Sequence, residues 1–122
     1  MRRKKILLVD DSEAILMLER LFLQADYDIT MAKDGRSGIA KAIADHPDLV
    51  ILDLIMPGMT GAHVCRALRA EESTRRTPIV MVSSHCEPGL ISASYRSGCS
   101  AYITKPIRGP ELLATVKSFL GD

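Results

Sequence analysis

The chain has 122 residues, 47% of them hydrophobic and 25% charged, which suits one compact domain with a single core and excludes a disordered or fibrous protein. Sixteen basic residues against fifteen acidic ones leave a net charge of +1, so nothing in the composition favours nucleic acid or a membrane surface as a partner. The apolar run that follows the basic start, Ile6–Val9, is too short for a signal peptide or a membrane span. We therefore expect a cytoplasmic protein.

The first half of the chain predicts two strand–helix units. A strand at Ile6–Val9 precedes a helix whose apolar face we assign to Ala14, Met17, Leu18, Leu21, Phe22 and Ala25. A weaker extended stretch at Tyr27–Ala32 precedes a helical pattern that Pro47 stops and that is marked by Ile39, Ala42 and Ile43.

The second half predicts three more units. Strands at Leu49–Leu52 and Ile79–Val82 are followed by helical patterns at Val64, Cys65 and Leu68 and at Leu90, Ile91 and Ala93. A last extended stretch, Ala101–Thr104, precedes a helix with Pro110 in its first turn and a predicted buried face of Leu112, Leu113, Val116, Phe119 and Leu120.

The strong apolar runs lack the alternation of half-exposed strands, as expected when helices cover both faces of a parallel sheet. Five strands alternating with five helices predict a doubly wound α/β sandwich. Ligands of such sheets bind beyond the carboxyl ends of the strands. The three cysteines, which are odd in number and form no CxxC pair, are expected to be reduced and mostly buried: Cys65, Cys86 and Cys99.

Charged and polar residues stand where four of the predicted strands end. In chain order they are the pair Asp10 and Asp11 after the first strand, Asp53 after the third, Ser83 and Ser84 after the fourth, and Lys105, followed by Pro106, after the fifth. Any one of them has an ordinary explanation, since Asp10, Asp11 or Ser12 is suited to cap the following helix. Three gathered carboxylates are harder to explain, because like charges about 4–5 Å apart repel by roughly 3–4 kcal/mol at an effective dielectric near 20.

Such a cluster needs cations. Lys105 supplies one, and Mg²⁺ suits an all-oxygen site with room for water. Carboxylates beside Mg²⁺ and a lysine indicate phosphoryl chemistry, in which an aspartate can act as nucleophile and form an acyl phosphate. Asp53 is the best candidate nucleophile, because it ends a central strand and the Asp10–Asp11 pair can flank it as metal ligands.

Four motifs in order resemble the receiver domains of bacterial two-component response regulators, which are CheY-like proteins. The motifs are LLVDDSE (Leu7–Glu13), VILDLIMPGMTG (Val50–Gly61), PIVMVSS (Pro78–Ser84) and GCSAYITKP (Gly98–Pro106). The resemblance covers the whole chain and implies one receiver domain over residues 1–122. It also implies a flavodoxin-like, CheY-like (βα)5 fold with strand order 2-1-3-4-5.

The resemblance implies a role for each site residue. Asp53 resembles the phospho-acceptor, which takes its phosphoryl group from a histidine kinase or phosphotransfer protein. Asp10 and Asp11 resemble the acidic pair of the Mg²⁺ site, which also uses the backbone carbonyl two residues past the acceptor, here that of Ile55. Lys105 resembles the lysine that pairs with the phosphoryl group. The protein would be a signalling switch whose catalysis is limited to its own phosphotransfer and dephosphorylation.

Two further residues resemble the switch of the family. Ser83 matches the hydroxyl that turns toward the phosphoryl group, and Tyr102 matches the aromatic side chain that changes rotamer in response. The surface formed by the fourth helix, fifth strand and fifth helix would then change. The implied partner is a downstream protein or an output domain beyond these residues, and a phosphorylation-dependent homodimer is also conceivable. No direct nucleic acid or membrane binding by this domain is expected.

Three positions depart from the family or leave its chemistry open. Ser84 replaces the usual alanine and narrows access to the acceptor. Ile55 and His85 occupy the positions that tune how water reaches an acyl phosphate, so the phosphoryl lifetime is not predicted. His85 beside Cys86 lacks a third partner for a metal or nucleophile site.

Other classes of protein fit less well. A pseudo-receiver, which binds proteins without being phosphorylated, is the main alternative, although it would be expected to have lost one of the site residues. A hydrolase with an aspartate nucleophile would need a second carboxylate where Ile55 stands. Gly35 and Gly38 form no phosphate-binding motif, which disfavours a nucleotide or flavin protein.

Overall fold

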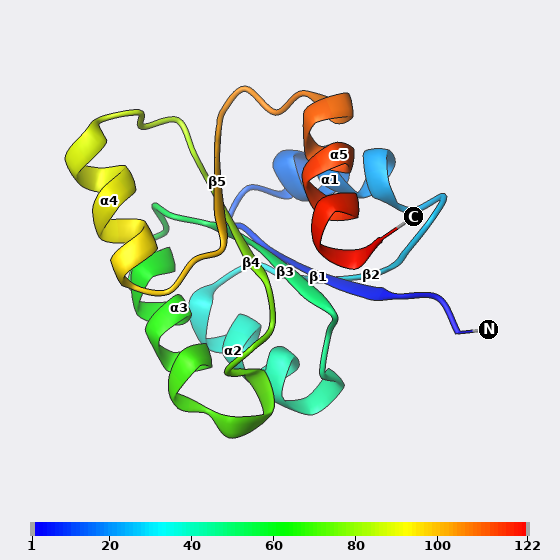
Figure 1. Ribbon diagram of the computed structural model, residues 1–122, viewed down its shortest axis with the longest axis horizontal. Helices are drawn as coiled ribbons and strands as arrows, with labels where there is room; N and C mark the ends of the chain where they lie inside the picture. Colours follow the sequence, from blue (N-terminus) through cyan, green and yellow to red (C-terminus); the bar gives the residue numbers. More distant parts are fainter. Residues whose placement is uncertain (1, 122) are drawn as a thin grey trace.

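The computed structural model describes residues 2–121. Strands and helices alternate along the chain (Figure 1), and they are β1 (Lys5–Val9), α1 (Glu13–Leu23), β2 (Asp28–Ala32), α2 (Gly35–Asp45), β3 (Leu49–Asp53), α3 (Gly61–Ala70), the short 3-10 helix η1 (Glu72–Thr74), β4 (Ile79–Ser83), α4 (Pro88–Arg96), β5 (Ala101–Thr104) and α5 (Gly109–Leu120).

The five strands form one parallel sheet in the order β2-β1-β3-β4-β5. The chain steps outward from β1 to β2 and then crosses back to β3, so the strand order reverses between β1 and β3. In doubly wound folds this reversal opens a crevice at the carboxyl ends of the two strands. The fold and strand order predicted from the sequence are therefore confirmed.

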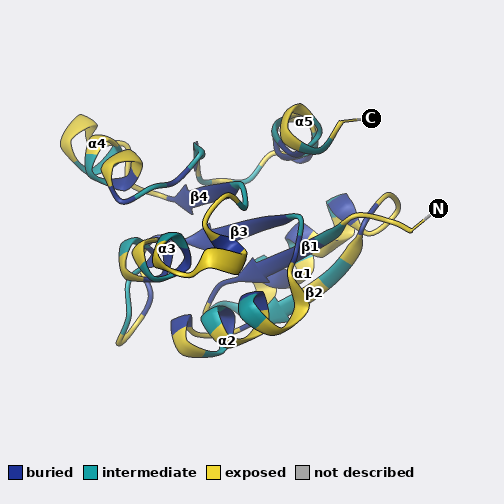
Figure 2. Cartoon of the chain, turned by 60° about the horizontal axis from the view of Figure 1, so that its bottom comes forward, coloured by how far each residue is buried: buried dark blue, intermediate teal, exposed yellow. Residues whose placement is uncertain are grey.

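Helices cover both faces of the sheet (Figure 2). Successive residues of each central strand enter opposite cores. From β1, Ile6 and Leu8 pack with residues of α1 and α5, whereas Leu7 and Val9 pack with residues of α2 and α3. Leu90 of α4 packs on this second core. Burial on both faces explains why the strands read as unbroken apolar runs.

The predicted buried face of α1 is wrong in part. Met17 and Leu21, assigned to the core, are 46% and 63% exposed, while Leu16, Glu19 and Leu23 are buried. Apolar residues occur on more than one side of this helix, so helical spacing alone fits two different faces. The side of α1 that is buried carries Glu19. Because a glutamate is rarely buried, its presence argued against that side as the core-facing one.

Smaller predictions have mixed outcomes. Phe119, expected in the core, is exposed on α5. All three cysteines are free, and two of them are buried, but Cys86 is exposed. No helix within residues 2–121 is long and apolar enough to cross a membrane.

Candidate functional site

The turn between β1 and α1 fixes the first carboxylate of the site. The Asp10 N–H donates to the Ala32 carbonyl at 3.1 Å, and Asp10 Oδ1 accepts the Ser12 N–H at 2.9 Å. Ser12 caps α1, because its Oγ accepts the Ile15 N–H at 3.3 Å. Since Ser12 caps the helix, neither Asp10 nor Asp11 is needed as the cap, and both can bind a cation.

The end of β3 places Asp53 in the same crevice. Its side chain is buried, and the next residue continues the sheet because the Leu54 N–H donates to the Val82 carbonyl at 3.0 Å. Gly61 begins α3 directly against this strand end: a Cβ there would lie 2.5 Å from the Asp53 carbonyl oxygen. Only glycine permits this approach, so Gly61 helps to fix the position of Asp53.

The loop after β5 brings a cation to both carboxylates. Lys105 Nζ lies 3.4 Å from Asp53 Oδ1 and 3.5 Å from Asp10 Oδ2. The Lys105 backbone N–H donates to the Ser83 carbonyl at 2.8 Å, which ties this loop to the end of β4. The Lys105–Pro106 peptide bond is cis. The structure thus assembles the predicted charged residues at one sheet edge.

The three aspartates also form a set suited to a metal ion. One carboxylate oxygen from each of Asp10, Asp11 and Asp53 lies within 4.8 Å of the others. Asp10 Oδ2 is buried and accepts no hydrogen bond within residues 2–121, although Lys105 is near it. A buried anionic oxygen without a hydrogen-bond donor is costly, and oxygen ligands match Mg²⁺. These residues therefore fit the predicted metal, which would use Asp10, Asp11 and Asp53.

Crowding of charge shifts the protonation equilibria of the site. Burial raises the pKa of Asp53 to about 6; Asp10 adds to the rise, while Lys105 and a hydrogen bond from the Ile55 backbone oppose it. Burial alone would lower the pKa of Lys105, but Asp10 and Asp53 raise it overall. Lys105 is thus held as a cation between two carboxylates, and Asp53 is poised to lose its proton near neutral pH.

Glu19 is a fourth acid that sequence reasoning did not assign to the site. Its side chain is 1% exposed, and Oε1 has no hydrogen-bond partner among the described residues. Burial raises the pKa of Glu19 to about 8; Asp10 and Asp53 contribute to the rise, and Lys105 opposes it. The carboxyl group is therefore neutral at pH 7. The only sequence signal was a charged residue among mostly apolar ones in this helix, which fits an exposed residue equally well.

The predicted switch residues meet at the backbone of His85 rather than at Asp53. The His85 N–H donates to the Ser83 Oγ at 3.2 Å, and the Tyr102 hydroxyl donates to the His85 carbonyl at 2.7 Å. Ser83 is buried, whereas Ser84 and His85 are exposed. The His85 imidazole faces Glu87, with Nδ1 3.2 Å from Oε2. The backbone of one residue, His85, therefore connects the two side chains, through its N–H to Ser83 and through its carbonyl to Tyr102.

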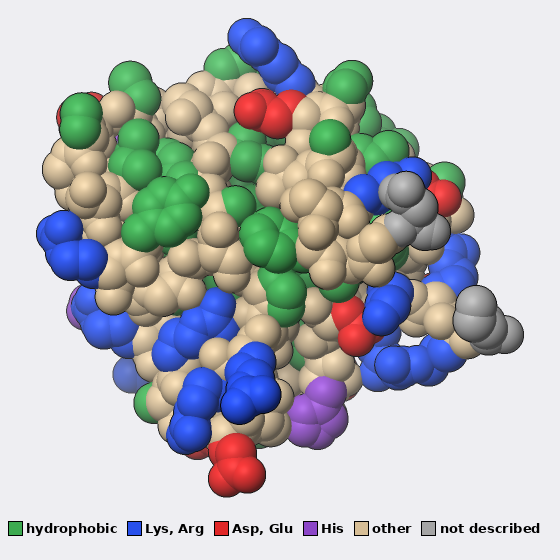
Figure 3. Space-filling model, viewed as in Figure 1, with side chains coloured by type: hydrophobic (Ala, Val, Ile, Leu, Met, Phe, Trp, Pro, Cys, Tyr) green, Lys and Arg blue, Asp and Glu red, His purple; other side chains and the backbone are tan. Residues whose placement is uncertain are grey.

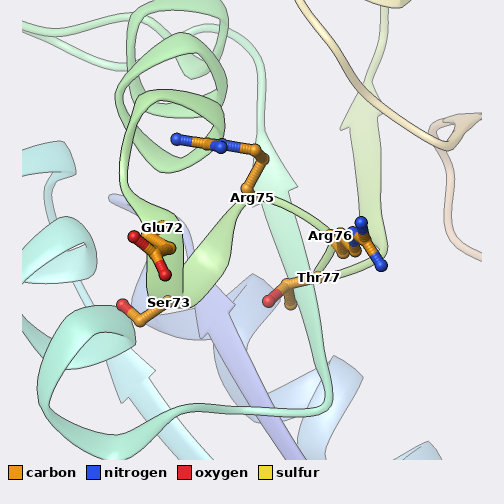
Figure 4. Close-up of a pocket in the computed structure, with 5 residues that line it drawn as sticks. All are labelled: Glu72, Ser73, Arg75, Arg76 and Thr77. Atoms are coloured by element: carbon orange, nitrogen blue, oxygen red, sulfur yellow. The ribbon is translucent and has the colours of Figure 1, made fainter.

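A hollow of about 560 Å³ lies away from this site, at the turn between α3 and β4 (Figure 4). The turn precedes β4, so it lies at the sheet edge opposite Asp53. The side chains of Arg75 and Arg76 point in different directions in Figure 4, and Arg75 Nε donates to the Arg69 carbonyl at 3.3 Å. Its lining by Glu72, Ser73, Arg75, Arg76 and Thr77 contains none of the site residues predicted from the sequence.

The response regulator receiver domain is the family whose model matches this chain, over residues 6–117. The chain therefore belongs to the receiver domains of response regulators, the class that its fold and acidic crevice define. Response regulator PleD of Caulobacter vibrioides is 40% identical over 115 residues, which cover 93% of this chain and 25% of PleD. The chain thus spans about a quarter of the length of this relative.

Solved structures agree with this membership. The chemotaxis protein CheY4 of Vibrio cholerae superposes with a TM-score of 0.92 at 33% identity, covering 97% of this chain and 99% of that one. The receiver domain of the sensor histidine kinase PA1611 from Pseudomonas aeruginosa superposes with a TM-score of 0.91 at 25% identity, covering 99% and 100%. That structure holds a magnesium ion coordinated in its active site cleft.

Proposed function

We propose that the protein is a phosphorylation-dependent signalling switch that takes a phosphoryl group onto Asp53 from the phosphohistidine of a histidine kinase or phosphotransfer protein. The observation that carries this proposal is the convergence of Asp10, Asp11, Asp53 and Lys105 at one sheet edge. The membership in the receiver family supports the same assignment.

The transfer needs an ionised nucleophile and a stabilised leaving group. An oxygen of the Asp53 carboxylate attacks phosphorus, the phosphorus–nitrogen bond of the donor breaks, and its electron pair returns to the imidazole. Lys105, already 3.4 Å from Asp53 Oδ1, offsets charge on the phosphoryl oxygens. A pKa of about 6 leaves Asp53 mostly ionised at neutral pH.

We assign Mg²⁺ to Asp10, Asp11 and Asp53, with the Ile55 backbone carbonyl as a further ligand. The bound ion would neutralise negative charge on the transferred group. The unsatisfied Asp10 Oδ2 supports a cation at this place, and the magnesium in the PA1611 receiver domain provides a precedent in a related fold.

Signal output follows from the link at His85. A phosphoryl group on Asp53 would draw the Ser83 hydroxyl, which now accepts the His85 N–H, and the Tyr102 hydroxyl, bonded to the carbonyl of the same residue, would be displaced with it. Hydrophobic side chains gather over α4, β5 and α5 in Figure 3, and exposed Tyr95 and Phe119 belong to these helices. We assign this face to a target protein, an output domain or a second phosphorylated copy.

We propose that residues 1–122 act as one receiver domain in the cytoplasm, without direct contact to nucleic acid or membrane. The side chains of Ser84, His85 and Ile55 are exposed, and we assign to Ile55 and His85 the control of how water reaches a phosphoryl group on Asp53.

Intact mass after incubation with Mg²⁺ and acetyl phosphate tests the proposal, with Asp53→Ala as the matched control. We expect one added phosphoryl group, which is lost in the variant and when the metal is chelated. Addition that survives Asp53→Ala would place the acceptor elsewhere. Absence of addition with acetyl phosphate and with phosphohistidine donors would favour a pseudo-receiver.

A further inference from the structure

A second hollow, of about 410 Å³, lies where β1 begins and α5 ends. Asp10 follows the other end of β1, so a strand of five residues, about 16 Å long, separates this hollow from the aspartate crevice. Figure 3 shows Lys and Arg side chains gathered at the same side of the molecule. The hollow is therefore distinct from the site assigned above.

Positive charge dominates the lining of this hollow. Arg2, Arg3, Lys4 and Lys117 line it, and among residues 2–121 one carboxylate, that of Asp26, faces them. The side chains of Arg2, Lys4 and Lys117 form no ion pair or hydrogen bond with another residue between positions 2 and 121. Since these three side chains have no such partner, they repel one another, and an anion placed between them removes that repulsion.

Arg3 makes one wall of the hollow rigid. Its NH2 group donates to the carbonyls of Gln24 and Tyr27, at 2.6 and 2.9 Å, and its Nε lies 3.5 Å from Asp28 Oδ1. These contacts tie the segment before β1 to the end of α1 and the start of β2. The cations are thus presented around a fixed concave surface, which lowers the entropic cost of binding a ligand.

The remaining lining is uncharged and includes an aromatic ring and an aliphatic side chain. Tyr27 is buried in the floor, and half-buried Leu120 of α5 forms part of the rim. A simple inorganic anion would leave this apolar part uncovered, whereas an organic anion would cover both parts. The volume lies within the range of small-molecule sites, about 300–1,000 Å³.

From these features we propose that the hollow binds a phosphorylated small molecule of nucleotide size. Arginine and lysine together suit phosphate oxygens, and the apolar rim receives the organic part of the ligand. A nucleic acid strand would instead require a row of cations that follows its backbone, whereas these four surround a single concavity.

Isothermal titration calorimetry with ADP tests the proposal, in EDTA and about 0.15 M salt so that the aspartate crevice holds no metal–nucleotide complex and weak surface attraction is screened. We expect saturable binding of one ADP per chain. A double variant, Lys4→Gln with Lys117→Gln, is expected to bind about tenfold more weakly. The control Arg66→Gln removes an exposed cation of α3 outside the hollow and should leave binding unchanged.

Pyrophosphate and adenosine, titrated separately, test the two halves of the ligand, and both should bind more weakly than ADP. If pyrophosphate and ADP bound equally well, the claim that the apolar rim receives the organic part of the ligand would be refuted. If ADP showed no saturable binding, the whole proposal would be refuted. The same loss in Arg66→Gln would also overturn it, because the attraction would then be unspecific. Phosphorylation of Asp53 by acetyl phosphate should persist in the double variant, so this result is independent of the proposed switch.

Discussion

Replacement of Glu19 by glutamine is expected to stabilise the protein at alkaline pH and to change little at acid pH. Glutamine has nearly the same shape as a protonated glutamic acid and cannot ionise. The pKa of Glu19 is raised from 4.5 to about 8 in the folded protein, where burial is the main cause, followed by Asp10. The folded state therefore holds this proton more tightly than the unfolded chain.

The sign of the effect follows from proton linkage. Between pH 4.5 and about 8 the unfolded chain has released the proton and the folded protein has not, so the free energy of unfolding falls as the pH rises through this interval. The full shift corresponds to a loss of about 5 kcal/mol. Water that enters to hydrate the ionised carboxylate reduces the loss, and we expect about 2–3 kcal/mol.

Urea unfolding in EDTA at pH 5, 7 and 8.5 measures this loss as the difference between Glu19→Gln and the parent protein. Titration of Asp53 affects both proteins and cancels in the difference. The control is Glu13→Gln, because Glu13 lies on the same helix with an exposed side chain that pairs with Lys33 at 3.4 Å. A difference between Glu19→Gln and the parent that does not grow between pH 5 and 8.5 would refute the reasoning.

Three other substitutions test separate features of the fold. Gly61→Ala would force a Cβ against the Asp53 carbonyl, so we expect a loss of about 1–3 kcal/mol in urea unfolding and slower phosphorylation; Gly89→Ala, whose Cβ meets open space, is the control. His46 ends α2 with a φ of 50°, so His46→Gly should raise the stability by about 0.5–1 kcal/mol, and a lower melting temperature would contradict this. Tyr102→Phe keeps the ring but loses the bond to the β4–α4 loop; we expect a loss of about 1 kcal/mol and unchanged phosphorylation of Asp53 by intact mass, whereas abolished phosphorylation would show that the hydroxyl acts on the acceptor.

The sequence predicted the sheet and the charged crevice well because both depend on strand geometry. An unbroken run such as Leu49–Leu52 has few alternatives to a strand buried on both faces, and the residue that follows a parallel strand must appear at the carboxyl edge. Asp10 and Asp53 could therefore be placed together before their distances were known.

Helix orientation and backbone contacts could not be predicted in the same way. On α1 the choice between Leu21 and Glu19 as the inward residue depends on what the opposing strands and loops present, which helical spacing does not contain. The contact of Tyr102 with the His85 carbonyl depends on the path of the β4–α4 loop, and a sequence motif records side chains rather than carbonyl positions. Both features required tertiary structure.

The neutral state of Glu19 gives the crevice a charge that suits one divalent ion. The formal charges of Asp10, Asp11, Asp53 and Lys105 leave two negative charges, which one Mg²⁺ would balance. An ionised Glu19 would add a third negative charge near the same residues. The electrostatic repulsion among the carboxylates would then destabilise the metal-free protein further. Because burial keeps its proton in place near neutral pH, Glu19 can lie close to the aspartates without adding to the repulsion that a cation must relieve.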